Sequence, residues 1–148
     1  MTLFEKTDQE AVLARIGRLG ATSARKWGTM TPAQMMAHCS AALEVATGDR
    51  PKTQRLLGKI LTPFIRSSIL GDKPFGQGAP TDPDFRIRGE RDFDAERRRL
   101  SELVERFVRL GPDSAARQTH SFFGRLSGDE WGRLMAKHLD HHLNQFDV

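Results

Sequence analysis

Helix start and stop signals recur along this chain, and they constrain its fold more than any other feature does. In residues 31–34, Thr-Pro-Ala-Gln, Thr31 can cap a helix, Pro32 suits the first helical position, and Gln34 can reach back to the cap. Residues 127–130, Ser-Gly-Asp-Glu, form another capping box. These signals predict one helix from Thr31 to Gly48 and another that runs from Ser127 almost to the C-terminus.

Three further segments carry weaker helix signals. A Thr7/Glu10 capping box and a closing Gly20 predict a first helix, and residues 53–69 predict another that bends where Pro63 removes a donor. A helix is also expected from Asp92 or Asp94 to Leu110, where Gly111-Pro112 would stop it. Because no segment alternates with a period of two, we predict no sheet. The expected fold class is all-α: one four-helix bundle domain over residues 1–148.

Residues 71–91 predict a long irregular connection between the third and fourth main helices. Three prolines and four glycines lie between Gly71 and Gly89, while Phe75, Phe85 and Ile87 can anchor the segment. Long connections in small domains are often functional, so a lid or a pocket wall is one interpretation. An ordered surface segment is the other, and the sequence does not separate the two.

Composition narrows the classes of function. The single cysteine, Cys39, excludes an intrachain disulfide, and neither a secretory signal nor a run of about 18 apolar residues is visible. We therefore expect a cytoplasmic protein with no membrane partner. The net charge is +4, and its densest run, residues 97–99, lies in an amphipathic helix. Such a run is typical of a solvated face, so we expect no nucleic-acid partner.

Two histidines four residues apart lie on the apolar side of the last predicted helix. At about 100° per residue, His138 falls at about 340° and His142 at about 20°, with Trp131 taken as zero. The apolar stripe of the helix lies around the same direction, and its members are Trp131, Leu134, Met135, Leu139 and Phe146. This spacing places two imidazoles one turn apart on a buried face, where they could bind one metal ion.

A third ligand is expected from a facing helix, and His38 is the candidate because it lies in the other strongly capped helix. A lone histidine such as His38 is more often an ordinary core or surface residue than a ligand. The other candidates have plain structural interpretations. His141 lies at the border of the buried face, His120 lies in a loop, and Cys39 suits a small buried position better than a ligand or nucleophile. Asp140 and Lys137 are expected to face water.

Three stretches of the sequence match a known pattern: residues 27–38, WGTMTPAQMMAH, the tail from residue 122 to residue 146, and residues 80–83, Pro-Thr-Asp-Pro. In these stretches the chain resembles the DinB-like (DinB/YfiT-type) superfamily of metalloproteins, and within it a family of unknown function. This resemblance implies a four-helix bundle whose metal is held by one histidine of the second helix and a His-x-x-x-His pair of the last. Those positions are His38, His138 and His142. The superfamily motif often continues His-Arg-Gly-Gln, and here only Gln145 is kept.

Three neutral imidazoles leave a divalent metal its full charge and an open position, and both zinc and nickel suit such ligands. Because bound water or a bound thiol loses its proton readily there, we predict a metal-dependent thiol S-transferase or hydrolase. Its partners would be a small-molecule substrate and a low-molecular-weight thiol, with Arg86 and Arg88 as candidate anion contacts. The alternative is a non-catalytic metal-binding or stress-related module, which could be a homodimer. A nucleic-acid binder using residues 97–99 is the least favoured hypothesis.

Overall fold

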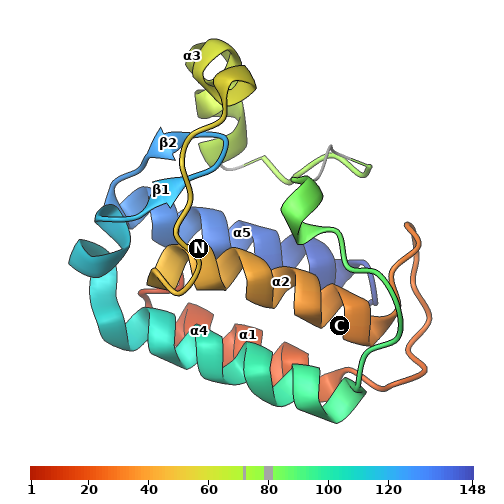
Figure 1. Cartoon of the computed structure of the whole chain (residues 1–148). Coiled ribbons are helices and arrows are strands. Elements are labelled where there is room, and N and C mark those ends of the chain that lie inside the picture. The colour runs from red at the N-terminus through yellow and green to blue at the C-terminus, as the bar shows by residue number, and fades with distance from the viewer. Residues whose placement is uncertain (72, 79–81) are drawn as a thin grey trace.

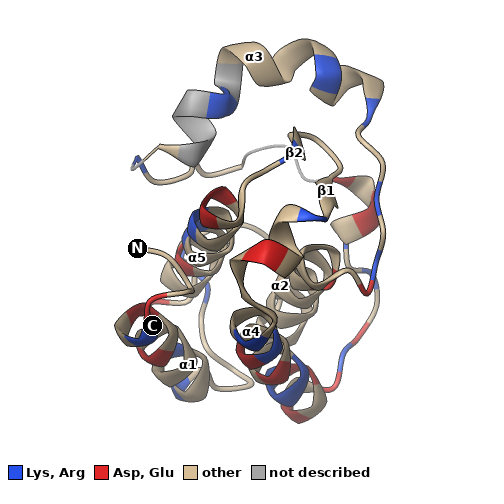
Figure 2. Cartoon of the chain, turned by 90° about the vertical axis from the view of Figure 1, so that its left-hand side faces the viewer, with Lys and Arg blue, Asp and Glu red and all other residues tan. Residues whose placement is uncertain are grey.

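The computed structural model describes residues 1–71, 73–78 and 82–148, apart from the side chains of residues 65 and 67–70. Helices dominate this part of the chain, so the predicted all-α fold class is confirmed. In chain order the elements are α1 (Lys6–Arg18), α2 (Pro32–Thr47), α3 (Leu56–Leu70), the 3-10 helix η1 (Pro83–Phe85), α4 (Phe93–Ala116), β1 (Thr119–His120), β2 (Gly124–Arg125) and α5 (Gly128–Asn144). Figures 1 and 2 show α1, α2, α4 and α5 bundled together, while α3 stands apart beyond the two strands.

Helix α2 packs against both α4 and α5, and η1 and β1 cover further parts of its surface. Nearly all of its residues are buried, including the polar His38 and Ser40. Its alanines allow neighbouring helices to approach closely, and a helix that is apolar on all sides is stable only when it is covered on all sides. The large side chains that fill the space around it come from every other bundle helix and include Ile16, Leu100, Phe107, Trp131 and Leu139.

The two strong N-terminal signals are confirmed. Thr31 and Gln34 form a reciprocal capping box at the start of α2, and Ser127 and Glu130 form another at the start of α5. Gly48 ends α2 in the left-handed conformation, with φ of 87°. Because α2 and α5 carry the candidate ligands, these caps fix where each ligand helix begins.

The boundaries predicted for the first helix were wrong. Helix α1 begins at Lys6 after Glu5, whose side chain makes no capping hydrogen bond, and it ends before an extended Leu19 rather than at Gly20. The reason is a tertiary contact: Leu3 is completely buried and its amide donates to the Gly132 carbonyl. This attachment to α5 turns the chain before Lys6, so the expected Thr7 cap lies inside the helix.

One expectation is confirmed here and another requires correction. Helix α4 starts at its Asp92 cap as predicted, and Gly111, with φ of 78° and ψ of 173°, breaks its helical path directly after Leu110, where the stop was predicted. A further helical segment that includes Pro112 follows the break and extends the element to Ala116. The chain also contains a small antiparallel sheet, which we had not predicted. Its strands β1 and β2 are two residues each, too short to show alternation.

The connection after α3 is anchored to the bundle by an aromatic side chain. Asp82 accepts a hydrogen bond from the Asp84 amide and so caps η1, which places Phe85 in the core. Phe75 is partly buried against the core as well. Residues 80 and 81 of the Pro-Thr-Asp-Pro match lie outside the described residues. Within the described part of the chain, no helix is both long and apolar enough to cross a membrane.

Candidate metal centre

The structure brings the three predicted ligands together where α2 faces α5. His38 comes from α2, and His138 and His142 come from successive turns of α5; their candidate ligand nitrogens all lie within 4.8 Å of one another. The closest pair is His38 Nε2 and His138 Nε2, at 3.0 Å. Three nitrogens bound to one zinc ion at 2.0–2.1 Å would lie about 3.3 Å apart. The group therefore fits a single metal ion in both its size and its donor type.

A backbone carbonyl fixes the tautomer of His38. Its Nδ1 lies 2.9 Å from the carbonyl oxygen of Phe85, which can only accept a hydrogen bond. Nδ1 must therefore carry the proton, and the Nε2 lone pair is directed toward His138. Side chain and backbone of Phe85 thus act together, because the ring anchors η1 in the core and the carbonyl orients His38.

A side-chain amide fixes the tautomer of His142. Gln145 Nε2 donates to the Trp27 carbonyl at 2.7 Å, so its Oε1 is the atom that faces His142 Nδ1 at 3.1 Å. Since an amide oxygen only accepts, His142 Nδ1 is protonated and Nε2 is left for a metal. The imidazoles of His38 and His142 are therefore oriented as metal-binding histidines usually are: a hydrogen bond from Nδ1–H holds the ring and leaves Nε2 for the metal.

Gly28 makes this arrangement possible. A Cβ atom there would lie 2.4 Å from Gln145 Nε2, and φ of 77° is a conformation that other residues adopt only with strain. Gln145 itself is only 2% exposed, so its amide has no alternative partners in water. The segment before α2 is therefore built to hold the last turn of α5 in place.

Burial keeps all three histidines neutral. It lowers the pKa of His38 and lowers that of His138 well below its usual range. It lowers the pKa of His142 to about 3, and the neighbouring imidazole of His38 acts in the same direction. Because only a neutral imidazole can donate its lone pair, the site is ready for a cation at physiological pH.

The two remaining histidines lie beside the centre but outside it. His141 contacts the ring of Trp27 in a tilted arrangement and the ring of Phe75 edge to face, with ring centroids 5.6 and 5.9 Å away, and burial lowers its pKa. His120 accepts hydrogen bonds at Nδ1 from the amides of Phe122 and Phe123 and so closes the β1–β2 turn. A structural role therefore accounts for His120.

Two residues expected to face water are partly covered instead. Asp140 pairs with Arg15 of α1 at 2.7 Å, and Lys137 donates to the Gly71 carbonyl and lies over the ring of Phe75. The reason is that α1 and the connection after α3 cover the flanks of α5, which a helical wheel cannot show. Cys39 is buried, as predicted, and burial raises its pKa, so the thiol is unsuited to nucleophilic chemistry.

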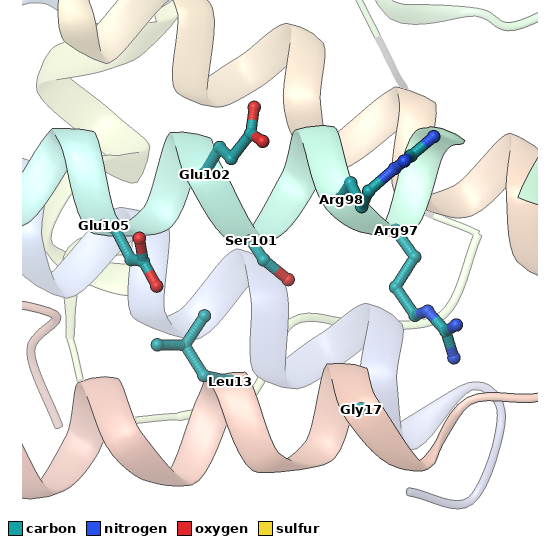
Figure 3. Close-up of a pocket in the computed structure, with 7 residues that line it drawn as sticks. All are labelled: Leu13, Gly17, Arg97, Arg98, Ser101, Glu102 and Glu105. Carbon is teal, nitrogen blue, oxygen red and sulfur yellow. The ribbon is translucent and has the colours of Figure 1, made fainter. Parts of the chain in front are cut away.

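The surface of the described structure includes the following two hollows. One, of about 310 Å³, lies between α1 and α4; Figure 3 shows Arg97 and Arg98 there on the same helix as Glu102 and Glu105, so charges of both signs mix. The other has a volume of about 170 Å³ and is lined by His141, the sequence neighbour of His142. Its lining consists of Trp27, Pro74, Phe75, Gln77, Lys137, Asp140, His141 and Asn144. We call it the His141 hollow.

Sequence reasoning missed the residues that hold the ligands. The spacing of His142 and Gln145, three residues apart at a helix end, was an available signal, because such side chains are neighbours. Phe85 gave no signal, since its carbonyl comes from a connection 47 residues away from His38. Arg86 and Arg88 are exposed, and their anion-binding role stays a prediction.

Comparison with known families adds one finding. Residues 3–148 match the model of a family described as Protein of unknown function (DUF1569). The chain belongs to the DUF1569 family. No curated protein and no solved structure matches it. Membership of a family of unknown function is thus confirmed, while the wider DinB-like relation of this DUF1569 chain stays a prediction.

Proposed function

We propose that this protein binds one divalent cation, zinc or nickel, through His38, His138 and His142. The observation that carries the proposal is the pair of fixed tautomers, since Phe85 and Gln145 each hold an Nδ1–H and leave Nε2 to the shared centre. His38 is buried and His138 and His142 are half-buried. Three such imidazoles side by side would otherwise be a costly arrangement, because each loses water without gaining a full set of partners.

We further propose that the centre is catalytic and that it acts on a small electrophile as a thiol S-transferase or hydrolase. A cation held by three neutral ligands would supply an open position with a strong positive field, which favours the deprotonated form of water or a low-molecular-weight thiol. This chain offers no evident nucleophile of its own there, because its single cysteine is buried with a raised pKa. The protein's contribution is therefore to orient the ligands and to exclude bulk water.

The His141 hollow is our candidate for the place of the substrate. Its aromatic walls, Trp27 and Phe75, suit an apolar group, and Lys137 and Asp140 add polar groups to its lining. His141 lines the hollow and its ring also contacts that of the candidate ligand His142, with the ring centroids 5.0 Å apart. A volume of about 170 Å³ accommodates only a small molecule or part of one, which favours a small electrophile over a polymer.

Metal content and turnover test the two parts of the proposal separately. Elemental analysis of natively purified protein should find about one zinc or nickel ion per chain. A His138→Ala/His142→Ala double variant should lose it, while His141→Ala, the matched control, should keep it. Turnover of model electrophiles with a panel of thiols should be lost in the double variant, which lacks the metal; His141→Ala is the control for metal content alone, because His141 lines the proposed substrate hollow.

Each outcome has a distinct meaning. Protein that contains no metal and binds none would contradict the whole proposal. Tight metal binding without any turnover would instead favour the non-catalytic module, and activity that survives in the double variant would place the chemistry elsewhere.

A further inference from the structure

Helix α3 presents a large apolar surface to solvent. Its exposed side chains, with their exposed fractions, are Leu56 (74%), Leu57 (61%), Ile60 (57%), Leu61 (37%) and Phe64 (79%). We call these five residues the α3 face. Elsewhere in the described structure the only exposed large apolar side chains are Met1 and Leu110. Contiguous apolar surface on this scale in a water-soluble chain marks an interaction site.

The α3 face is held outward by polar contacts on the opposite side of the helix. Phe122 contributes a carbonyl that accepts hydrogen bonds from Gln54 Nε2 at 2.9 Å and from Thr62 Oγ1 at 3.1 Å. Gly58 lies so close to the same carbonyl that a Cβ atom would be 2.2 Å away. Figure 2 shows α3 lying beyond the strands, away from the other helices. The apolar side therefore cannot turn inward without breaking these contacts.

The shape of the α3 face suits another helix. Leu56, Ile60 and Phe64 recur every four residues and form one ridge, and Leu57 and Leu61 form a second ridge beside it. Ridges of this kind accept the ridge of a facing helix in the groove between them. A second copy of the chain supplies an identical helix, and an interface made from the same patch on both partners closes with two-fold symmetry.

Charge distinguishes a second copy from an anionic membrane. Arg55 pairs with Asp82 at 3.0 Å and with Asp84 at 3.3 Å, and Arg66 pairs with both carboxylate oxygens of Glu130. These two arginines, at the ends of the α3 face, are therefore neutralised within their own chain, and exposed Lys59 is the remaining cation of α3. A helix that binds an anionic lipid surface presents a cluster of free cations to the headgroups, and one lysine does not make such a cluster, so charge favours a second copy.

The apolar area of the α3 face is also close to what a dimer interface requires. Its five side chains expose roughly 600 Å² per copy, which is most of the area of about 800 Å² that a standard interface takes from each partner. We propose that α3 packs antiparallel against α3 of a second copy, across a two-fold axis that passes near Ile60. This assembly is independent of the metal centre.

The first experiment measures mass in solution. Analytical ultracentrifugation of the whole chain at high micromolar concentration should give twice the mass of one chain. Ile60→Asp/Phe64→Asp should give a single-chain mass with an unchanged helical circular dichroism spectrum, because both side chains are exposed in the isolated chain. Leu110→Asp, which changes an equally apolar exposed residue on α4, should remain a dimer. A wild-type monomer, or a dimeric double variant, would overturn the proposal.

The second experiment tests the geometry. An Ile60→Cys variant should form a disulfide-linked dimer under mild oxidation, since the axis brings both copies of residue 60 together. Leu110→Cys should not form this dimer. The wild-type chain is the negative control for cross-linking, because its only cysteine, Cys39, is buried. Failure of Ile60→Cys to cross-link would overturn the arrangement. Co-sedimentation of a monomeric wild-type chain with phosphatidylcholine–phosphatidylserine vesicles would assign the α3 face to a membrane surface instead.

Discussion

In the candidate metal centre, His38 and His142 each carry a proton on Nδ1, because the group that faces this nitrogen can only accept a hydrogen bond. The Phe85 carbonyl cannot donate, and the Gln145 amide cannot reverse because the Trp27 carbonyl holds its nitrogen. Rotation of either ring would cost a buried hydrogen bond, and an unsatisfied buried polar group is expensive. The ligands are therefore oriented before any cation arrives.

Removing the amide of Gln145 should weaken metal binding without removing a ligand. In Gln145→Leu, His142 loses the acceptor that holds Nδ1–H, and loss of such a partner lowers metal affinity by about 10- to 100-fold. Competition with a chromophoric zinc chelator measures this change. Asn144→Ala, at the neighbouring exposed position, is the control and should bind zinc as the wild-type chain does. Equal affinities of all three proteins would show that the amide does not orient His142.

Protonation of His120 should destabilise the fold in acid. Burial lowers its folded-state pKa to about 4, from 6.5 in the unfolded chain, so the unfolded state takes up the proton first. The contribution of the neutral ring is complete above pH 6.5 and is lost as the pH falls toward 4. Protonation at Nδ1 would also set an N–H against the amides of Phe122 and Phe123.

The His120→Asn variant isolates this effect, because its side-chain oxygen can still accept those two amide hydrogens. Between pH 6.5 and pH 4 it should lose about 2 to 3 kcal/mol less unfolding free energy than the wild-type chain. Urea denaturation at a series of pH values gives both curves. Parallel curves would contradict the lowered pKa of His120.

At the level of elements, capping motifs predicted the starts of α2 and α5 correctly. The start of α1 was mispredicted, because a tertiary contact determines it. The boxes at Thr31 and Ser127 are local in sequence, so the residues alone were sufficient. Helix α1 starts earlier than predicted because Leu3 attaches to α5, a contact more than a hundred residues away in sequence. Strands β1 and β2 were not predicted, because the turn between them is held by the side chain of His120. Such a short hairpin forms without the alternation of apolar and polar residues that predicts a strand.

A glycine substitution tests how α3 is attached. In Gly58→Ala the new Cβ would meet the Phe122 carbonyl carbon and oxygen, which are backbone atoms that cannot move aside cheaply. The clash should outweigh the gain of about 1 kcal/mol in helix propensity, so thermal stability should fall. Gly17→Ala is the matched control: it is exposed in α1 with nothing within 4 Å, and it should stabilise the chain by about 1 kcal/mol. Hydrogen exchange should show faster exchange confined to α3 in Gly58→Ala, and an unchanged pattern would contradict the attachment.

For the whole molecule, the metal centre joins parts of the chain that local patterns cannot relate. The placement of His138 and His142 on one face followed from helical periodicity, and His38 was chosen because its helix is strongly capped. The contributions of Phe85, Trp27 and Gly28 could not be predicted, because they depend on how a connection and a loop fold over α2 and α5. The sequence thus predicted that these three histidines come together, and the three-dimensional packing supplies the groups that orient them.

Because the candidate ligands bridge α2 and α5, a bound cation should stabilise the entire fold. Binding to the folded state alone at 100 times the dissociation constant contributes about 2.7 kcal/mol, which for a chain of this size corresponds to a rise in Tm of about 5 to 10 °C. Scanning calorimetry with and without zinc, and again after chelation, measures the shift. The His138→Ala/His142→Ala variant should show no rise, whereas His141→Ala should show the full rise. A zinc-dependent rise that persists in the double variant would mean that the stabilising ion binds somewhere other than between these two helices.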